Sequence, residues 1–269
     1  MASRAAALDL SMGIPGCSPN PDYGTGAYRR RIRLTADAGT VAAQLDDNYH
    51  ALWSQVDHEG GVIRRVEGGF SRAPTTGCGS AGEELRAFIG RGIDLTLPEL
   101  SRAVDPRCHC THMLDLTVLA IREAARGEGR RRYEIVVPDA VDGRVTVDLL
   151  IDDRRVVSWQ VHAGMVVAPA EVAGRKLLRG FLTWAFAHLD GEALEQAVII
   201  QKGYFVSQAR RNIIDDRPRP LTEFPDREGV CHAYSQPRFG WAIQEAGNSR
   251  DFSAGVVEAP PPDPSSRPL

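Results

Sequence analysis

The strongest constraint on the fold is a long stretch in which apolar and polar residues alternate. The alternation begins at Ile32 within YRRRIRLTAD (residues 28–37) and continues through residues 40–72. Because successive side chains of a β-strand point to opposite faces, this period of two predicts strands. The segment HEGG at 58–61 separates two such runs and is typical of a hairpin turn. The sequence therefore predicts a meander of antiparallel strands.

After this meander the apolar period becomes that of a helix. Residues 80–92 predict a first helix, residues 96–104 a short second helix with Pro98 in its first turn, and residues 111–127 a longer third helix. The apolar face of the first helix consists of Ala81, Leu85, Phe88 and Ile89. The apolar stripe of the third consists of Met113, Leu116, Ala120 and Ala124. Glycines follow both of these helices and should end them.

The second half of the chain repeats this order of elements. Residues 144–164 predict two strands around a turn at Asp152 and Asp153, residues 175–189 an amphipathic helix, residues 191–200 a short element, and residues 202–213 another helix. The predicted class is α+β, with antiparallel strands packed on helices. Two similar halves arising by duplication and a coincidental repetition of a common order both remain open.

Composition bounds the organisation and the partners. We expect an irregular arm over residues 1–27, a Cys/His-containing half over 28–128, a second α+β half over 129–253 and a disordered Pro-rich tail over 254–269. The net charge of −3 gives no electrostatic reason to expect nucleic acid or an anionic membrane as partner. Five cysteines cannot all pair, no apolar run is long enough to span a bilayer, and the N-terminus does not resemble a signal peptide. These features predict a cytoplasmic protein with reduced thiols and a small-molecule partner, and leave the oligomeric state open.

The segment CHCTHMLD, residues 108–115, concentrates groups that can do chemistry. Cys108, His109, Cys110 and His112 precede or open the third helix, and thiolate and imidazole are the preferred ligands of zinc and iron–sulfur clusters. Cys110 lies nearest the predicted N-cap, with Thr111 as the alternative, and the helix dipole should favour its thiolate. Asp115 follows His112 by three residues and could fix its tautomer. The Gly-rich segment TTGCGSAG places Cys78 as a remote ligand at another helix start.

Two further clusters contain titratable residues. Asp46 and His50 of LDDNYH would share one strand face, where a functional site and a solvated strand end are both open interpretations. For Asp47 the solvated strand end is the preferred interpretation. The segment VCHAYSQPR contains Cys231, His232 and Tyr234, for which a structural role is favoured over a functional one.

Several of these segments resemble known families. Six segments between residues 28 and 253 carry the first resemblance: RRRIRL, LDDNYH, SRAPTTGCGSAGEELRAFIG, CTHMLDLTVLAI, GVCHAYSQPR and SRDFS. Together they resemble the bacterial domain-of-unknown-function family 2889, and this resemblance implies no activity. Residues 39–127 are also similar to NifU/IscU-type iron–sulfur scaffold proteins, through GCGSAGEELRAFIGRGIDL and HCTHMLDLTVLAIREA. That resemblance implies metal-ligand positions at Cys78, His109 and Cys110. LDDNYH stands in the strand region, where the scaffolds carry a further cysteine and an aspartate.

These observations predict a Cys/His site and leave three functions open. The predicted metal ligands are Cys78, His109, Cys110, His112 and Asp46, for zinc or for iron, alone or in an iron–sulfur cluster. The first function is a small-molecule enzyme with metal-assisted lyase, hydrolase or isomerase chemistry, in which His50, His112 and Asp115 are catalytic. The second is a metal or iron–sulfur carrier without turnover. The third is a metal-free protein with a thiol–imidazole pair. The sequence favours the enzyme.

Overall fold

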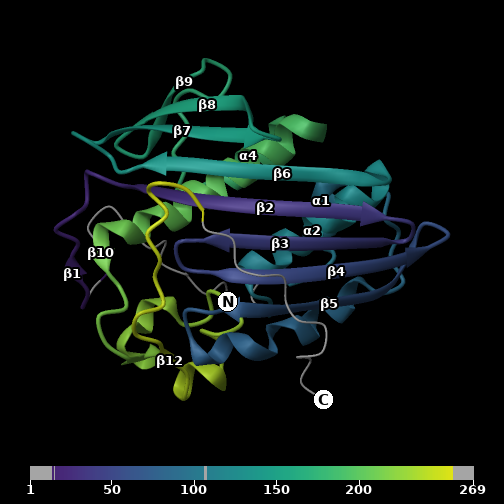
Figure 1. Cartoon of the computed structure of the whole chain (residues 1–269), viewed down its shortest axis with the longest axis horizontal. Coiled ribbons are helices and arrows are strands. Elements are labelled where there is room, and N and C mark those ends of the chain that lie inside the picture. Colours follow the sequence, from purple (N-terminus) through teal and green to yellow (C-terminus); the bar gives the residue numbers. More distant parts are fainter. Residues whose placement is uncertain (1–13, 15, 106–107, 257–269) are drawn as a thin grey trace.

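The computed structural model describes residue 14 and residues 16–105 and 108–256. Most of these residues belong to a large antiparallel sheet with helices on one of its faces, which confirms the predicted α+β class (Figure 1). The predicted Pro-rich tail from residue 257 onward, and most of the N-terminal arm, lie outside the described residues. No helix in the described part is both long enough and apolar enough to cross a membrane.

The sheet has eight strands, and hydrogen bonds join its neighbours in the order β5-β4-β3-β2-β6-β7-β8-β9. Every pair of neighbours is antiparallel. The strands are β2 (Ala27–Asp37), β3 (Thr40–Asp47), β4 (Ala51–Glu59), β5 (Val62–Arg72), β6 (Gly129–Pro138), β7 (Arg144–Ile151), β8 (Arg154–His162) and β9 (Met165–Ala168). Because β2 pairs with β6, one continuous sheet runs through both halves of the chain.

Both predicted hairpin turns are present. Gly60 and Gly61 connect β4 to β5, and Asp152 and Asp153 connect β7 to β8, all four with positive φ. A tight turn with two positive φ angles matches the twist of the strands that it joins, and glycine and aspartate adopt it at low cost. The hairpins therefore form where the sequence predicts them.

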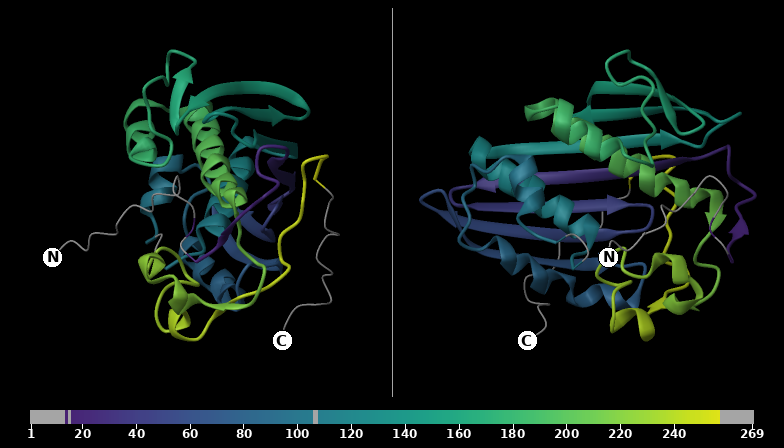
Figure 2. Two further views of the ribbon diagram at one scale, coloured as in Figure 1. Left: turned by 90° about the vertical axis from the view of Figure 1, so that its left-hand side faces the viewer. Right: turned by 180° about the vertical axis from the view of Figure 1, so that it is seen from behind.

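Helices cover one face of the sheet. They are the 3-10 helix η2 (Thr76–Phe88), α1 (Leu97–Arg102), α2 (Thr111–Arg126), α3 (Phe181–His188) and α4 (Gly191–Ser207). Figure 2 shows α2 and α4 crossing the same face, with α2 against β3 and β4 and α4 against β6 and β7. The remaining elements are short: β1 (Ser18–Pro19), η3 (Gln208–Arg211), β10 (Asn212–Ile213), β11 (Arg219–Pro220), η4 (Leu221–Glu223), η5 (Pro225–Arg227), η6 (Arg238–Gly240) and β12 (Ile243–Gln244).

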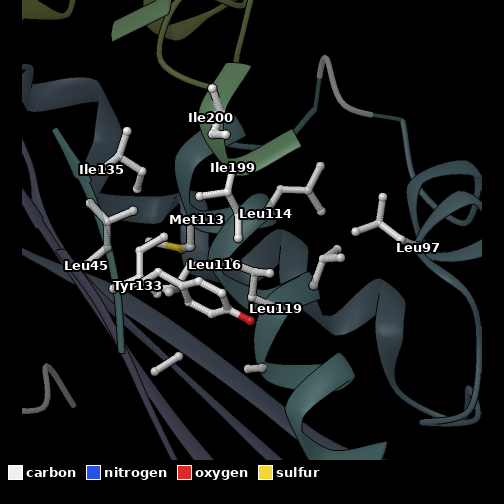
Figure 3. Close-up of a cluster of buried hydrophobic side chains, with 14 of the residues drawn as sticks. Leu45, Leu97, Met113, Leu114, Leu116, Leu119, Tyr133, Ile135, Ile199 and Ile200 are labelled. Atoms are coloured by element: carbon white, nitrogen blue, oxygen red, sulfur yellow. The ribbon is translucent and has the colours of Figure 1, made fainter. Parts of the chain in front are cut away.

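The core lies between the sheet and these two helices (Figure 3). Leu45 of β3 and Ile135 of β6 face Met113 of α2 and Ile199 of α4, and all four are at most 5% exposed. Burying a side chain of this size contributes about 1.5–3 kcal/mol. The apolar stripe predicted for the third helix is buried as expected.

The first predicted helix differs in type from the expectation. It is a 3-10 helix that begins at Thr76, and Ile89 lies beyond its end with 46% of its surface exposed. Gly82 explains part of this geometry, because a Cβ atom there would lie 2.1 Å from the backbone oxygen of Gly68. The 3-10 helix thus packs against β5 so closely at Gly82 that only glycine fits there.

The helices of the second half also differ from the predicted boundaries. The short element at 191–200 and the helix predicted from residue 202 form one helix, α4, with Gly203 inside it. Gly203 does not break the helix but lets it approach the sheet, since a Cβ atom would lie 2.7 Å from Cγ2 of Ile135. The helix predicted over 175–189 starts only at Phe181, because Gly180 has a φ of 71°. Strands followed by helices do occur in both halves, but a duplication and the division near residue 128 stay predictions.

Candidate functional site

A cavity of about 440 Å³ lies beside the start of α2. Its wall combines β5, η2, α2, α4 and the segment from Ile214 to Gln244. Most of the wall is apolar, and includes Phe70, Leu178, Leu182, Phe205 and Val230. Cavities of this size and character are typical of small-molecule sites.

His50 lines this cavity and is held from behind by Asp47. Asp47 is the last residue of β3 and is fully buried, and its Oδ1 lies 3.0 Å from Nδ1 of His50. The same oxygen accepts hydrogen bonds from the backbone N–H groups of Tyr49 and His50, both at 2.8 Å. The carboxylate therefore fixes both the turn between β3 and β4 and the imidazole that follows it.

The second oxygen of Asp47 binds two side chains of β2. Oδ2 accepts a hydrogen bond from Tyr28 at 2.8 Å and two from Arg30, at 3.0 Å from Nε and 2.7 Å from Nη2. Burial by itself would raise the pKa of Asp47, but His50 and Arg30 outweigh it and hold the pKa well below its usual range. Asp47 is thus ionised at neutral pH. The expectation that it is a solvated strand end is wrong, because the strand turns it into the core.

His112 packs its ring against that of His50, with the ring centroids 4.1 Å apart and the planes inclined by 34°. It is the second residue of α2 and also lines the cavity. Removal from water lowers the pKa of His112 well below its usual value, and the nearby His50 and Arg30 lower it further. His112 is therefore neutral at physiological pH and available as a hydrogen-bond donor or acceptor.

Asp115 does not have the predicted role beside His112. Its carboxylate forms an ion pair with Lys202 of α4 at 3.0 Å, and no hydrogen bond between Asp115 and His112 is found within the described ranges. Asp115 and Lys202 both line a second, smaller cavity of about 210 Å³, and Lys202 also lines the first. Asp115 thus balances the charge of Lys202 instead of fixing the tautomer of His112.

Cys78, Cys110 and Cys231 line the cavity as neutral thiols. Burial raises the pKa of Cys78 to about 11 and also raises the pKa values of Cys110 and Cys231. Cys110 is the N-cap of α2, but its side chain caps no backbone N–H, and Thr111 is already helical. The expected thiolate stabilisation by the helix dipole is therefore outweighed by desolvation.

The predicted metal ligands converge only in part. Cys78, Cys110 and His112 line the cavity. Asp46 and His109, which the structure also describes, are not among its lining residues. Within residues 14, 16–105 and 108–256, no group of three or more His, Cys, Asp and Glu side chains is arranged to hold a metal ion. The ligand set for zinc or iron therefore stays a prediction.

Neither a known family model nor a curated protein matches this chain. The resemblances to family 2889 and to the NifU/IscU-type scaffolds therefore stay predictions.

The residues that the sequence-based interpretation missed are Asp47, Tyr28 and Arg30. A signal for the last two exists: Tyr28 and Arg30 are in phase with Ile32, which places them on the buried face of β2. A cation on that face requires a buried anion nearby. Cys231 and Tyr234 were also assigned a structural role, yet both line the cavity, whereas the ring of His232 contacts Ser80 and the backbone oxygen of Cys108.

Proposed function

We propose that this chain is a small-molecule enzyme in which His50 transfers protons to and from a substrate in the cavity. The observation that carries the proposal is the contact of 3.0 Å between Asp47 and Nδ1 of His50. An ionised carboxylate at Nδ1 keeps the proton on that nitrogen and leaves the lone pair of Nε2 for the substrate. Asp47 is the positioning residue, and His50 is the catalytic residue.

The surrounding groups suit general acid–base chemistry in a dry site. The neutral ring of His112 lies beside His50, where it can donate or accept a hydrogen bond without adding charge. A cavity thiol becomes a nucleophile only if a base removes its proton, and His50 lies on the same wall as the thiols. Lyase, hydrolase and isomerase reactions all need such a proton transfer, and no step of the proposed chemistry passes through a metal ion.

A non-catalytic metal or iron–sulfur carrier is the second candidate. The observation in its favour is that Cys78, Cys110 and Cys231 share one wall, where Cys78 and Cys231 both raise the pKa of Cys110. All five cysteines are free, which supports a reducing compartment such as the cytoplasm. Elemental analysis of protein purified without added metal separates the candidates, because a carrier should retain zinc, or iron and sulfide, in stoichiometric amount.

The enzyme proposal is tested by turnover without a chosen substrate. Purified protein is incubated with a metabolite extract, and mass spectrometry records which compounds are consumed. We expect the wild-type protein to consume a compound that the His50→Gln variant leaves unchanged. The matched control is His162→Gln at the exposed end of β8. Equal consumption by the His50→Gln variant would refute the role of His50, and melting curves of all variants verify that they are folded.

A further inference from the structure

The charges on the cavity wall define the kind of molecule that fits inside. Two permanently charged side chains line the cavity among the described residues, Lys202 and Arg227, and both are cations. Aspartate and glutamate do not occur on the described part of this wall. Lys202 already has an acidic partner in Asp115, at 3.0 Å. The charge that remains to be balanced is therefore that of Arg227.

Arg227 is held in place by aromatic rings instead of a carboxylate. Its guanidinium lies 5.2 Å from the ring centroid of Phe224 and 5.9 Å from that of Tyr234. No ion pair joins it to an acid in the part of the chain that the structure describes. Arg30 and Arg219, by contrast, have Asp47 and Asp216 within 2.7 Å. Nη1 of Arg227 also donates a hydrogen bond to the hydroxyl of Tyr234 at 3.5 Å. The aromatic contacts limit the motion of the guanidinium, while its other N–H groups can bind an anion.

We infer that the substrate is an apolar monoanion, an alkyl or aryl carboxylic acid whose carboxylate binds Arg227. This inference rests on the proposed function, which makes the cavity the substrate site. A guanidinium presents two parallel N–H groups that match the two oxygens of a carboxylate. The apolar wall, with Phe70, Leu182 and Phe205, accommodates the hydrocarbon body. A single unbalanced cation suits one negative charge better than a phosphate or a dicarboxylate.

His50 and Arg227 lie on different parts of the wall, β3–β4 and η5, and both border the same space. An elongated acid can therefore bind Arg227 through its carboxylate while another carbon faces His50. Arg227 then selects carboxylates for binding, and His50 transfers protons to and from the bound molecule. The two roles can be tested separately.

The binding test compares a carboxylate with its neutral isostere. Octanoate and octanamide are titrated into the full chain by calorimetry. We expect the wild-type protein to bind octanoate about 10-fold or more tightly than octanamide, as a charge-assisted pair allows. The Arg227→Gln variant should bind both equally. The matched control is Arg217→Gln, a nearby arginine with 54% of its side chain exposed, which should keep the preference for octanoate.

Three results would overturn the inference: no binding of either probe by the wild-type protein, equal binding of both, or a preference for octanoate that survives in Arg227→Gln. If Arg227→Gln binds neither probe, Arg227→Lys decides. It keeps the charge without the fork, so octanoate should bind more weakly than to the wild-type protein but still more tightly than octanamide. Absence of that preference also overturns the inference.

The His50→Gln variant separates this inference from the proposed function. It should retain the preference for octanoate, because Arg227 is intact, while losing turnover. If turnover survives in His50→Gln and the preference depends on Arg227, the proposed function fails and the substrate class stands. If turnover depends on His50 but the wild-type protein does not prefer octanoate, the substrate class fails and the proposed function stands.

Discussion

Replacing Asp47 by Asn should destabilise the protein more than most substitutions, because it removes the charge from a fully buried carboxylate. Asp47 accepts hydrogen bonds from the backbone of Tyr49, from the backbone of His50, from Tyr28 and twice from Arg30, and contacts the ring of His50. An Asn side chain turns an NH₂ group toward some of these donors, whichever way it is oriented. Arg30, which is 2% exposed, then keeps its charge without an anion.

The size of the effect follows from this loss of a partner. Removing one member of a buried ion pair costs about 3–5 kcal/mol, because the other charge stays buried and uncompensated. For a domain of this length such a loss corresponds to a fall in Tm of roughly 6–20 °C. In the Asp47→Asn/Arg30→Met double variant the unpaired charge is absent. Its loss of stability should therefore be clearly smaller than the sum of the two single losses.

Chemical denaturation at several pH values is the assay. The pKa of Asp47 is lowered on folding, so its contribution is present above its unfolded pKa of about 3.9 and is lost as the pH falls toward the folded pKa. The difference in unfolding free energy between the wild-type protein and the Asp47→Asn variant should thus be largest near pH 7 and smaller at pH 3. The control is Asp37→Asn, at the exposed end of β2. A loss below about 1 kcal/mol at pH 7, or strict additivity with Arg30→Met, would refute the assigned role of the pair.

Three further predictions concern other residues. Because the pKa of His112 is lowered on folding, the unfolded chain takes up this proton at a higher pH than the folded protein does, so the free energy of unfolding should fall as the pH drops below about 6.5. Denaturation of the His112→Asn variant should show a shallower decline of this free energy with falling pH. An unchanged slope would contradict the prediction. The Gly82→Ala variant should lose about 1–3 kcal/mol of unfolding free energy, because its new Cβ atom overpacks against the backbone. The Gly79→Ala variant in the same 3-10 helix has open space around its Cβ atom and should keep its stability. Equal melting curves of the two variants would disprove the close contact at Gly82. Alkylation of the folded protein at neutral pH, followed by mass spectrometry, should modify exposed Cys108 well before Cys78, whose pKa is raised to about 11, and the reverse order would show that the thiol is not buried.

The strands and turns were predictable because their signals are local. Alternation of side chains along β2 to β5 reports which face is buried, and the turns at Gly60–Gly61 and Asp152–Asp153 use residues that adopt positive φ. The third helix was equally predictable, since its apolar stripe and the glycine at its end lie within one segment. The predicted break between residues 200 and 202 was wrong, because one continuous helix runs from Gly191 to Ser207 and Gly203 inside it packs closely against Ile135 of a distant strand.

The residues of the candidate site show the same division. The sequence by itself determined that Cys78, Cys110, His112 and His50 belong to segments rich in polar and ionisable groups. Tertiary structure decided which of them meet: it placed Asp47 behind His50, Arg30 behind Asp47, and Lys202 beside Asp115. It also decided their charge states, because the pKa of a thiol or an imidazole depends on how much water and which charges surround it. A local pattern can indicate that a side chain is buried, but most of these partners belong to different strands and helices, so the pattern does not say which of them meet.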